Sequence, residues 1–153
     1  MKVIDFLQQG AIIAELSATT KAATLVEIAD HMATLNPRVD AAELRRVLEE
    51  RELLASTAIG DGIAIPHGKL DSVSQLVGTL GRSVPGLEFD SIDGKPTHLV
   101  FMLVAPASST GIHLKALARL SRLFRDALFR QRLIEAPDAP AMYRVITEED
   151  AKY

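Results

Sequence analysis

The stretch from Leu99 to Ala105 restricts the fold more than any other part of this sequence, because every residue in it is apolar. A strand with one face in water alternates apolar and polar side chains, whereas a strand covered on both faces is apolar throughout. The run reaches only about a third of the roughly 20 residues that a membrane-spanning helix needs. We therefore expect a β-strand with packed layers on both sides and no membrane insertion.

Helical patterns precede this run. A buried helical stripe is predicted at Leu25, Ile28, Ala29, Met32 and Leu35. The pair Asn36-Pro37 should end that helix, and Asp40 is a good N-cap for the next one, with Glu43 in the capping-box position. This second helix places Leu44, Val47 and Leu48 on one face, and we expect most of its charges to be solvated.

Helical patterns also follow the run. Ser108, Ser109 and Thr110 are candidate caps after Pro106. The next apolar stripe comprises Ala116, Leu117, Leu120, Phe124 and Leu128. Breaks near Arg125-Asp126 and at Pro137 should divide this last third into two or three helices.

Shorter apolar runs, typical of strands, occur at Ile63–Ile65 and Leu76–Leu80. Turns are predicted at Ser83–Gly86 and at Asp93-Gly94. Strands framed by helices at both ends indicate an α/β fold, or α+β sandwich, in which a small mixed β-sheet is flanked by helices.

Composition narrows the function. A chain of 153 residues, 48% of them hydrophobic, is typical of one globular domain, and its N-terminus does not resemble a signal peptide, so we expect a cytoplasmic protein. Acidic residues outnumber basic ones by 20 to 17 and aromatic residues make up 5%, which argues against a nucleic-acid partner. With no cysteine, the chemistry must use the four histidines, hydroxyls or carboxylates.

His67 is the first candidate for that chemistry. It follows the strand-like Ile63–Ile65 and stands between Pro66, which fixes its own φ, and Gly68, whose missing side chain leaves room for an incoming group. That setting predicts a presented histidine, although a lone histidine is more often structural. The nearby glycines match neither a dinucleotide fingerprint nor a phosphate-binding loop.

His113 is the second candidate, because it falls in the first turn of a helix that follows a buried strand. Free N–H groups and the helix dipole favour an anion there, although many first-turn residues only pack or cap. We expect His31 to be solvated and His98 to be structural. A zinc site from His67, His98, His113 and Asp61 lacks a close His-x-x-x-His pair, and no G-x-S-x-G elbow supports a hydrolase.

A longer motif surrounds His67. It runs from Glu52 over six residues to Ile59-Gly60, and after two further residues it ends in Ile-Ala-Ile-Pro-His-Gly at residues 63–68. This motif resembles the phosphorylation-site signature of the fructose/mannitol-type enzyme IIA domains of the bacterial phosphoenolpyruvate-dependent phosphotransferase system. Arg51-Glu52 and the segment 110–114 around His113 also match, and the resemblance covers essentially the whole chain. Ala58 departs from the pattern, since the family often has glycine there.

The resemblance implies a phosphotransferase/anion-transport-protein-like fold, with residues 1–153 forming a single enzyme IIA type-2 domain. It implies that His67 is the phosphorylated nucleophile and receives phosphate from a histidine phosphocarrier protein. Arg51 would stabilise charge and His113 would hydrogen-bond the phosphoryl group. No metal or cofactor is implied.

Three functions stay open. Within the family, residues 62–70 and 89–93 most resemble the free-standing nitrogen-branch enzyme IIA, which implies a phosphoryl carrier that regulates target proteins according to its phosphorylation state. A sugar-specific enzyme IIA that donates to a separate IIB and permease is the second possibility. A binding module that is no longer phosphorylated is the third. Because the chain has no cysteine for a IIB phosphorylation site, we expect it to stop at the IIA step.

Overall fold

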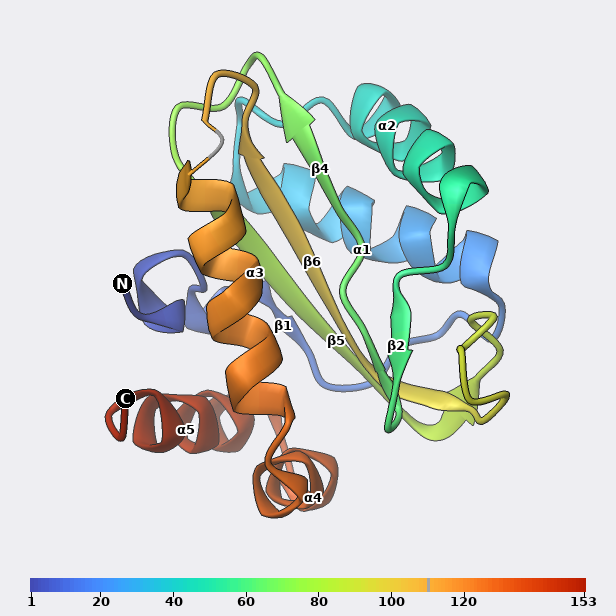
Figure 1. The fold of residues 1–153 in the computed structure, drawn as a ribbon, viewed down its shortest axis with the longest axis vertical. Helices are drawn as coiled ribbons and strands as arrows, with labels where there is room; N and C mark the ends of the chain where they lie inside the picture. Colours follow the sequence, from blue (N-terminus) through green and yellow to red (C-terminus); the bar gives the residue numbers. More distant parts are fainter. Residues whose placement is uncertain (110) are drawn as a thin grey trace.

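The computed structural model describes residues 1–109 and 111–153 (Figure 1). Thr110, one of the candidate caps, lies outside the described residues. The 3₁₀ turns are η1 (Val3–Asp5) and η2 (Gln9–Ala11). The helices are α1 (Lys21–Leu35), α2 (Ala41–Leu54), α3 (Gly111–Phe124), α4 (Ala127–Glu135) and α5 (Ala139–Asp150). The strands are β1 (Ile12–Ile13), β2 (Ala58–Gly60), β3 (Ile63–Ala64), β4 (His67–Leu70), β5 (Val77–Leu87) and β6 (Thr97–Pro106).

The strands form one mixed sheet in the order β1-β5-β6-β3-β2, with β4 also paired to β6. β5 and β6 are antiparallel and make up its longest ladder. β3 and β4 both run parallel to β6, where Ile63 pairs with Leu99 and His67 pairs with Leu103. The chain therefore follows one edge of β6 twice, with Ile65 and Pro66 between the two short strands.

β6 is buried on both faces, as its apolar run predicts. Leu99, Phe101 and Leu103 belong to one hydrophobic cluster, and Val100, Met102 and Val104 belong to the other. Successive side chains of a strand point to opposite faces, so this one strand supplies the centre of both cores. The predicted mixed sheet flanked by helices is confirmed.

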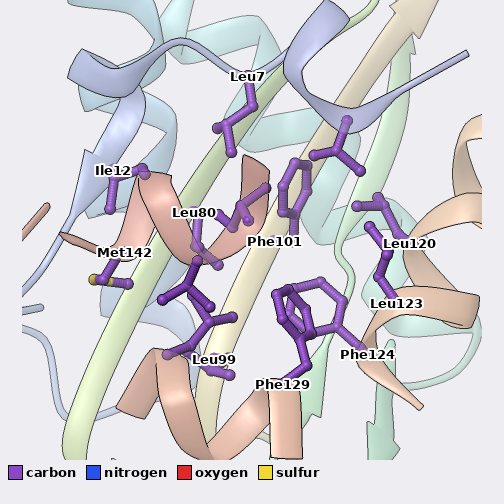
Figure 2. Packing of buried hydrophobic residues seen from close by; sticks show 14 of the residues in the cluster. Leu7, Ile12, Leu80, Leu99, Phe101, Leu120, Leu123, Phe124, Phe129 and Met142 are labelled. Atoms are coloured by element: carbon purple, nitrogen blue, oxygen red, sulfur yellow. The ribbon is translucent and has the colours of Figure 1, made fainter. Parts of the chain in front are cut away.

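Different helices cover the two faces. α1 and α2 close one face through residues such as Ile28, Met32 and Leu48. α3, α4, α5 and η1 close the other, where Figure 2 shows Leu120, Phe124, Phe129 and Met142 gathered over β5 and β6. Phe101 of β6 contacts the ring of Phe124 edge-on, with ring centroids 6.4 Å apart.

Carboxylate caps set several helix ends. Asp40 accepts hydrogen bonds from the amides of Ala42 and Glu43 at the start of α2, as predicted. Asp126 and Asp138 cap α4 and α5 in the same way, so the predicted breaks near Arg125-Asp126 and at Pro137 are confirmed. Each cap satisfies amides that have no partner within their own helix.

The turn predicted at Ser83–Gly86 is wrong, because these residues lie inside β5. The pairing register with β6 shifts between Arg82 and Leu87, and Gly86 has a φ of +88°. A Cβ at Gly86 would lie 2.8 Å from that of Pro96. Gly86 and Pro96 therefore lie at an irregular part of the β5–β6 pairing and not at a turn. The predicted turn at Asp93-Gly94 is present and joins β5 to β6.

The last residue of each predicted apolar stripe, Leu128 and Leu35, is also predicted wrongly. Leu128 belongs to α4, and not to the helix of Phe124, and 69% of its surface is exposed because the cap at Asp126 begins a new helix axis. Leu35 is the last residue of α1 and is exposed, whereas Leu25, Ile28, Ala29 and Met32 are buried.

No helix in the described ranges 1–109 and 111–153 combines the length and the apolarity that crossing a membrane requires.

Arg82 joins β5 to the end of α4. It is 3% exposed, and its guanidinium donates to the carbonyls of Leu133 at 2.8 Å, Ala136 at 2.6 Å and Ala14 at 2.9 Å. The last carbonyls of a helix have no partner within the helix, so this arginine satisfies them.

We expect Arg82→Met to lower the free energy of unfolding by about 3 kcal/mol, because it leaves buried carbonyls without donors. Urea denaturation measures the loss. Arg46→Met is the control, since Arg46 is exposed and pairs only with Glu50, and its effect should stay within about 0.5 kcal/mol. Equal effects of the two substitutions would contradict this role of Arg82.

Candidate functional site

Two of the predicted site residues, His67 and His113, lie against each other. His67 is the first residue of β4, and His113 lies in the first turn of α3, the helix that follows β6. Their ring centroids are 5.4 Å apart and the rings are inclined by 62°. The structure thus brings together side chains that lie far apart in the sequence.

The ring of His67 is held in one orientation. Its Nδ1 lies 2.8 Å from the carbonyl oxygen of Ile65. A carbonyl oxygen only accepts hydrogen bonds, so Nδ1 carries the proton and Nε2 keeps its lone pair. This half-buried imidazole therefore presents Nε2 as a nucleophile.

Both rings favour the neutral state. Burial is the largest influence on the pKa of His67 and lowers it below its ordinary value of 6.5. The positive charge of Arg51 lowers this pKa further, whereas the hydrogen bond to the Ile65 carbonyl and the charge of Glu52 raise it. Burial also lowers the pKa of His113, with smaller contributions from His67 and Lys69. His113 is 8% exposed, and its Nδ1 has no hydrogen-bond partner among the residues that the structure describes. The pair is thus uncharged near neutral pH.

Arg51, in the last turn of α2, places a cation close enough to His67 to lower the pKa of its ring. Its side chain is half-buried, and one guanidinium nitrogen donates to the carbonyl of Ala55 at 2.9 Å. That single bond leaves the other donors of the guanidinium fork available to an anion. A neutral nucleophile, a second imidazole and a guanidinium together suit the capture of a doubly charged group such as phosphoryl.

α2 reaches the site because Gly68 allows it to pack on β4. A Cβ on Gly68 would lie 2.7 Å from Cγ1 of Val47 and 3.9 Å from Cδ2 of Leu48. From the sequence, the missing side chain of Gly68 is expected to leave room for an incoming group. The structure instead uses the space for helix α2, which carries Arg51.

A buried charge network behind Arg51 was missed as a functional feature. Glu52, read from the sequence only as a motif position, accepts bonds from the amide and hydroxyl of Thr57 and lies 3.6 Å from the ammonium of Lys21. Lys21 belongs to the start of α1, far from the motif, and no sequence signal connects it to this place.

The other two histidines do not join the pair. Nδ1 of His98 lies 3.0 Å from the carbonyl of Ser83, in agreement with a structural role. His31 is not merely solvated, since its Nε2 lies 2.8 Å from the carbonyl of Gly10. Within the described part of the chain, no group of three or more His, Cys, Asp or Glu side chains is placed to hold a metal ion.

Ala58 does not distort the loop before His67. It lies in β2, 2% exposed, and pairs with Ala64 of β3 without a positive φ. A glycine is therefore not required at this position.

The histidine pair lies outside two neighbouring cavities of about 390 and 420 Å³. Both cavities are lined by the N-terminal segment and the β4–β5 connection, and neither is lined by Arg51, His67 or His113.

We expect the NMR titration midpoints of His67 and His113 to lie below 6.5. Folding keeps both rings neutral, so the unfolded chain binds protons at a higher pH than the folded chain does. Stability is then fully present above about pH 6.5 and falls as the pH falls through the lowered values. The double substitution His67→Gln, His113→Gln should remove this part of the pH dependence, whereas midpoints at or above 6.5 would contradict it.

We expect Gly68→Ala to lower stability by about 1–3 kcal/mol, because the new methyl group displaces Val47. Adding Val47→Ala should recover part of the loss, since it removes the colliding atom. A double-mutant cycle by urea denaturation measures this coupling. Strictly additive losses would show that Gly68 and Val47 do not compete for the same space.

Known proteins match this chain over nearly all of its length. Residues 5–149 match the family model described as "Phosphoenolpyruvate-dependent sugar phosphotransferase system, EIIA 2". A nitrogen regulatory protein of Bradyrhizobium diazoefficiens is 40% identical over 146 residues, which cover 95% of each chain. The fructose-specific EIIABC component of Bacillus subtilis is 34% identical over 98% of this chain, which spans 24% of that protein.

Solved structures of other IIA proteins have the same fold. The crystal structure of the nitrogen regulatory protein IIA-Ntr from Neisseria meningitidis superimposes with a TM-score of 0.85 at 29% identity, and covers 93% of this chain and 97% of that one. The IIA mannitol structure from Escherichia coli shares the fold, with a TM-score of 0.77 at 20% identity over 92% of this chain and 98% of that one. The chain belongs to the EIIA 2 family of the phosphoenolpyruvate-dependent sugar phosphotransferase system.

Proposed function

We propose that this chain is a cytoplasmic phosphoryl carrier, a single EIIA domain in which Nε2 of His67 takes phosphate from a phosphohistidine on a carrier protein. The observation that supports this most strongly is the neutral histidine pair, in which the bond from Nδ1 to the Ile65 carbonyl leaves Nε2 of His67 free. A phosphorylated imidazole keeps a high transfer potential, so the group can be passed on.

The step exchanges one N–P bond for another. The lone pair of Nε2 attacks phosphorus, the N–P bond of the donor imidazole breaks, and its electron pair returns to the donor nitrogen. The proton on Nδ1 of His67 stays on the bond to Ile65 throughout. Because like replaces like, the transfer is close to balanced in energy and reversible.

The remaining task is to hold the charge of the transferred group, and we assign this task to Arg51 and His113. The guanidinium fork of Arg51 would bind two phosphoryl oxygens, and an N–H of His113 would donate to a third. His113 is largely buried against His67, so its donor needs little reorganisation when the charge develops.

The surroundings of the pair suit a protein donor. Exposed apolar side chains lie near Arg51 and His113 along the chain, at Leu53, Leu54, Ile112 and Leu114. Transient signalling contacts use modest patches of this kind.

Regulation of target proteins according to phosphorylation state is the output that we favour. It rests on the nitrogen regulatory proteins of Bradyrhizobium diazoefficiens and of Pseudomonas aeruginosa, the latter 31% identical over 97% of this chain and 96% of that protein. A sugar-specific IIA that donates to a separate IIB protein is the second candidate, because the fructose-specific component of Bacillus subtilis matches 98% of the chain.

We expect the protein to take up phosphate from phosphoenolpyruvate in the presence of enzyme I and a histidine carrier. The product should be acid-labile and base-stable, as a phosphoramidate is, and radiolabelled phosphate measures it. His67→Ala should take up none. Uptake by His67→Ala equal to that of the original protein, or no uptake by either, would overturn the proposal.

We expect Arg51→Ala to slow phosphate uptake by about 100-fold, the usual effect of removing one donor from a charge-stabilising site. Its thermal midpoint should change little, because Arg51 makes one exposed bond to Ala55. Arg46→Ala, on the exposed side of the same helix, is the matched control and should keep the original rate. A rate loss in step with a stability loss would make Arg51 structural.

Acceptor assays separate the two outputs. We expect the phosphorylated protein to discharge slowly to sugar-specific IIB proteins, because its phosphate serves as a signal. Stopped-flow or quenched-flow transfer measures this rate. Rapid discharge to a fructose-type or mannitol-type IIB would favour the sugar-transport reading.

A further inference from the structure

Glu52 carries a buried carboxylate that is close enough to His67 to raise the pKa of its ring. Its side chain is 7% exposed. It accepts hydrogen bonds from the amide of Thr57 at 3.1 Å and from the hydroxyl of Thr57 at 2.5 Å. The ammonium of Lys21 lies 3.6 Å away, which compensates the buried charge. A charge held this way has a fixed place in the fold.

From Glu52, a chain of hydrogen bonds reaches the nucleophile. The carbonyl of Thr57 accepts from the amide of Ile65 at 3.0 Å. The carbonyl of Ile65 in turn accepts from Nδ1 of His67 at 2.8 Å. The carboxylate thus acts on the His67 ring through Thr57 and Ile65, without touching it.

Glu52 also holds the turn whose carbonyl oxygen accepts the hydrogen bond from Arg51. Its bonds to Thr57 close the turn that follows α2, and this turn contains Ala55, whose carbonyl holds the guanidinium of Arg51. Lys21 is itself fixed, because it lies 5.1 Å from the centroid of the Phe89 ring and 3.6 Å from the carboxylate of Asp90. The network therefore joins the start of α1 and the end of α2 to Thr57, the residue that precedes β2.

We propose that Glu52 is a positioning residue for phosphoryl transfer, which holds the His67 ring through Thr57 and Ile65 and holds Arg51 through the turn at Ala55. This inference rests on the proposed function of His67. It assigns a role to a residue that acts on the site only through the residues it holds.

The test uses three variants and a small phosphoryl donor. Glu52→Ala removes both the charge and the acceptors, and Glu52→Gln keeps an acceptor for Thr57 without the charge. Glu50→Ala is the matched control, since Glu50 lies on the same helix, is exposed, and bonds only to Arg46. Potassium phosphoramidate serves as the donor, so that docking of a carrier protein does not enter the rate.

We expect Glu52→Ala to slow phosphate uptake at His67 at least tenfold, while Glu52→Gln recovers most of the rate and Glu50→Ala keeps all of it. Thr57→Val should slow uptake less than Glu52→Ala, because the hydrogen bond from the backbone N–H of residue 57 to the Glu52 carboxylate remains. The rates should differ because the variants keep different numbers of the hydrogen bonds between residues 52 and 57.

NMR of the histidine rings separates positioning from simple loss of structure. The charged and titratable groups around His67 are Arg51 and Glu52 of α2 and His113 of α3, with Lys69 of β4 beside His113. Removing the Glu52 charge takes away an influence that raises the pKa of His67, so both Glu52 variants should titrate at lower pH than the original protein. Glu52→Ala should also lose the single protonated state of Nδ1.

Glu52→Ala with an uptake rate within twofold of Glu50→Ala, or with an unchanged titration of His67, would overturn the role of Glu52. A rate loss that tracks thermal stability while the ring is unchanged would overturn it too. If the original protein takes up no phosphate, the proposed function fails. The titration and the Nδ1 protonation still test the contacts of Glu52 in that case.

Discussion

The burial of β6 on both faces is the constraint on which the rest of this structure depends. Leu99, Phe101 and Leu103 look into the core under α3, α4 and α5, while Val100, Met102 and Val104 look into the core under α1 and α2. Among the strands of the described residues, β6 is the one that places three side chains in each of the two cores. The two helical layers are held together through this strand.

The site follows from that arrangement. β3 and β4 share one edge of β6, and the break between them places His67 opposite Leu103. β6 then leads to α3, whose first turn carries His113 back to the same place, while α2 packs on β4 and brings Arg51. The three groups thus come from three elements that pack on β6 or on β4 beside it, so the double core sets where they lie.

Much of this could be predicted from local patterns. The uninterrupted run Leu99–Ala105 identified the doubly buried strand, and Asp40 identified the start of α2. The motif around His67 identified the family, which the matching relatives show. These features depend on residues that are near one another in the chain.

The remaining features depend on residues that are far apart. The Ser83–Gly86 segment has turn composition but pairs with β6, because the register shift and the space beside Pro96 are set by the neighbouring strand. Gly68 leaves room for Val47 of α2, and Arg82 donates hydrogen bonds to carbonyls at the end of α4. Lys21 reaches Glu52 only once α1 and α2 are packed. No window of the sequence contains both members of such a pair.

We propose that Nε2 of His67 accepts the phosphoryl group while Nδ1 keeps its proton and its hydrogen bond to the Ile65 carbonyl. Nitrogen-15 NMR of histidine-labelled, phosphorylated protein tests this most directly. We expect coupling of phosphorus to Nε2 of His67, with Nδ1 of the same ring still protonated. Coupling of phosphorus to Nδ1 of His67, or to either nitrogen of His113, would contradict it.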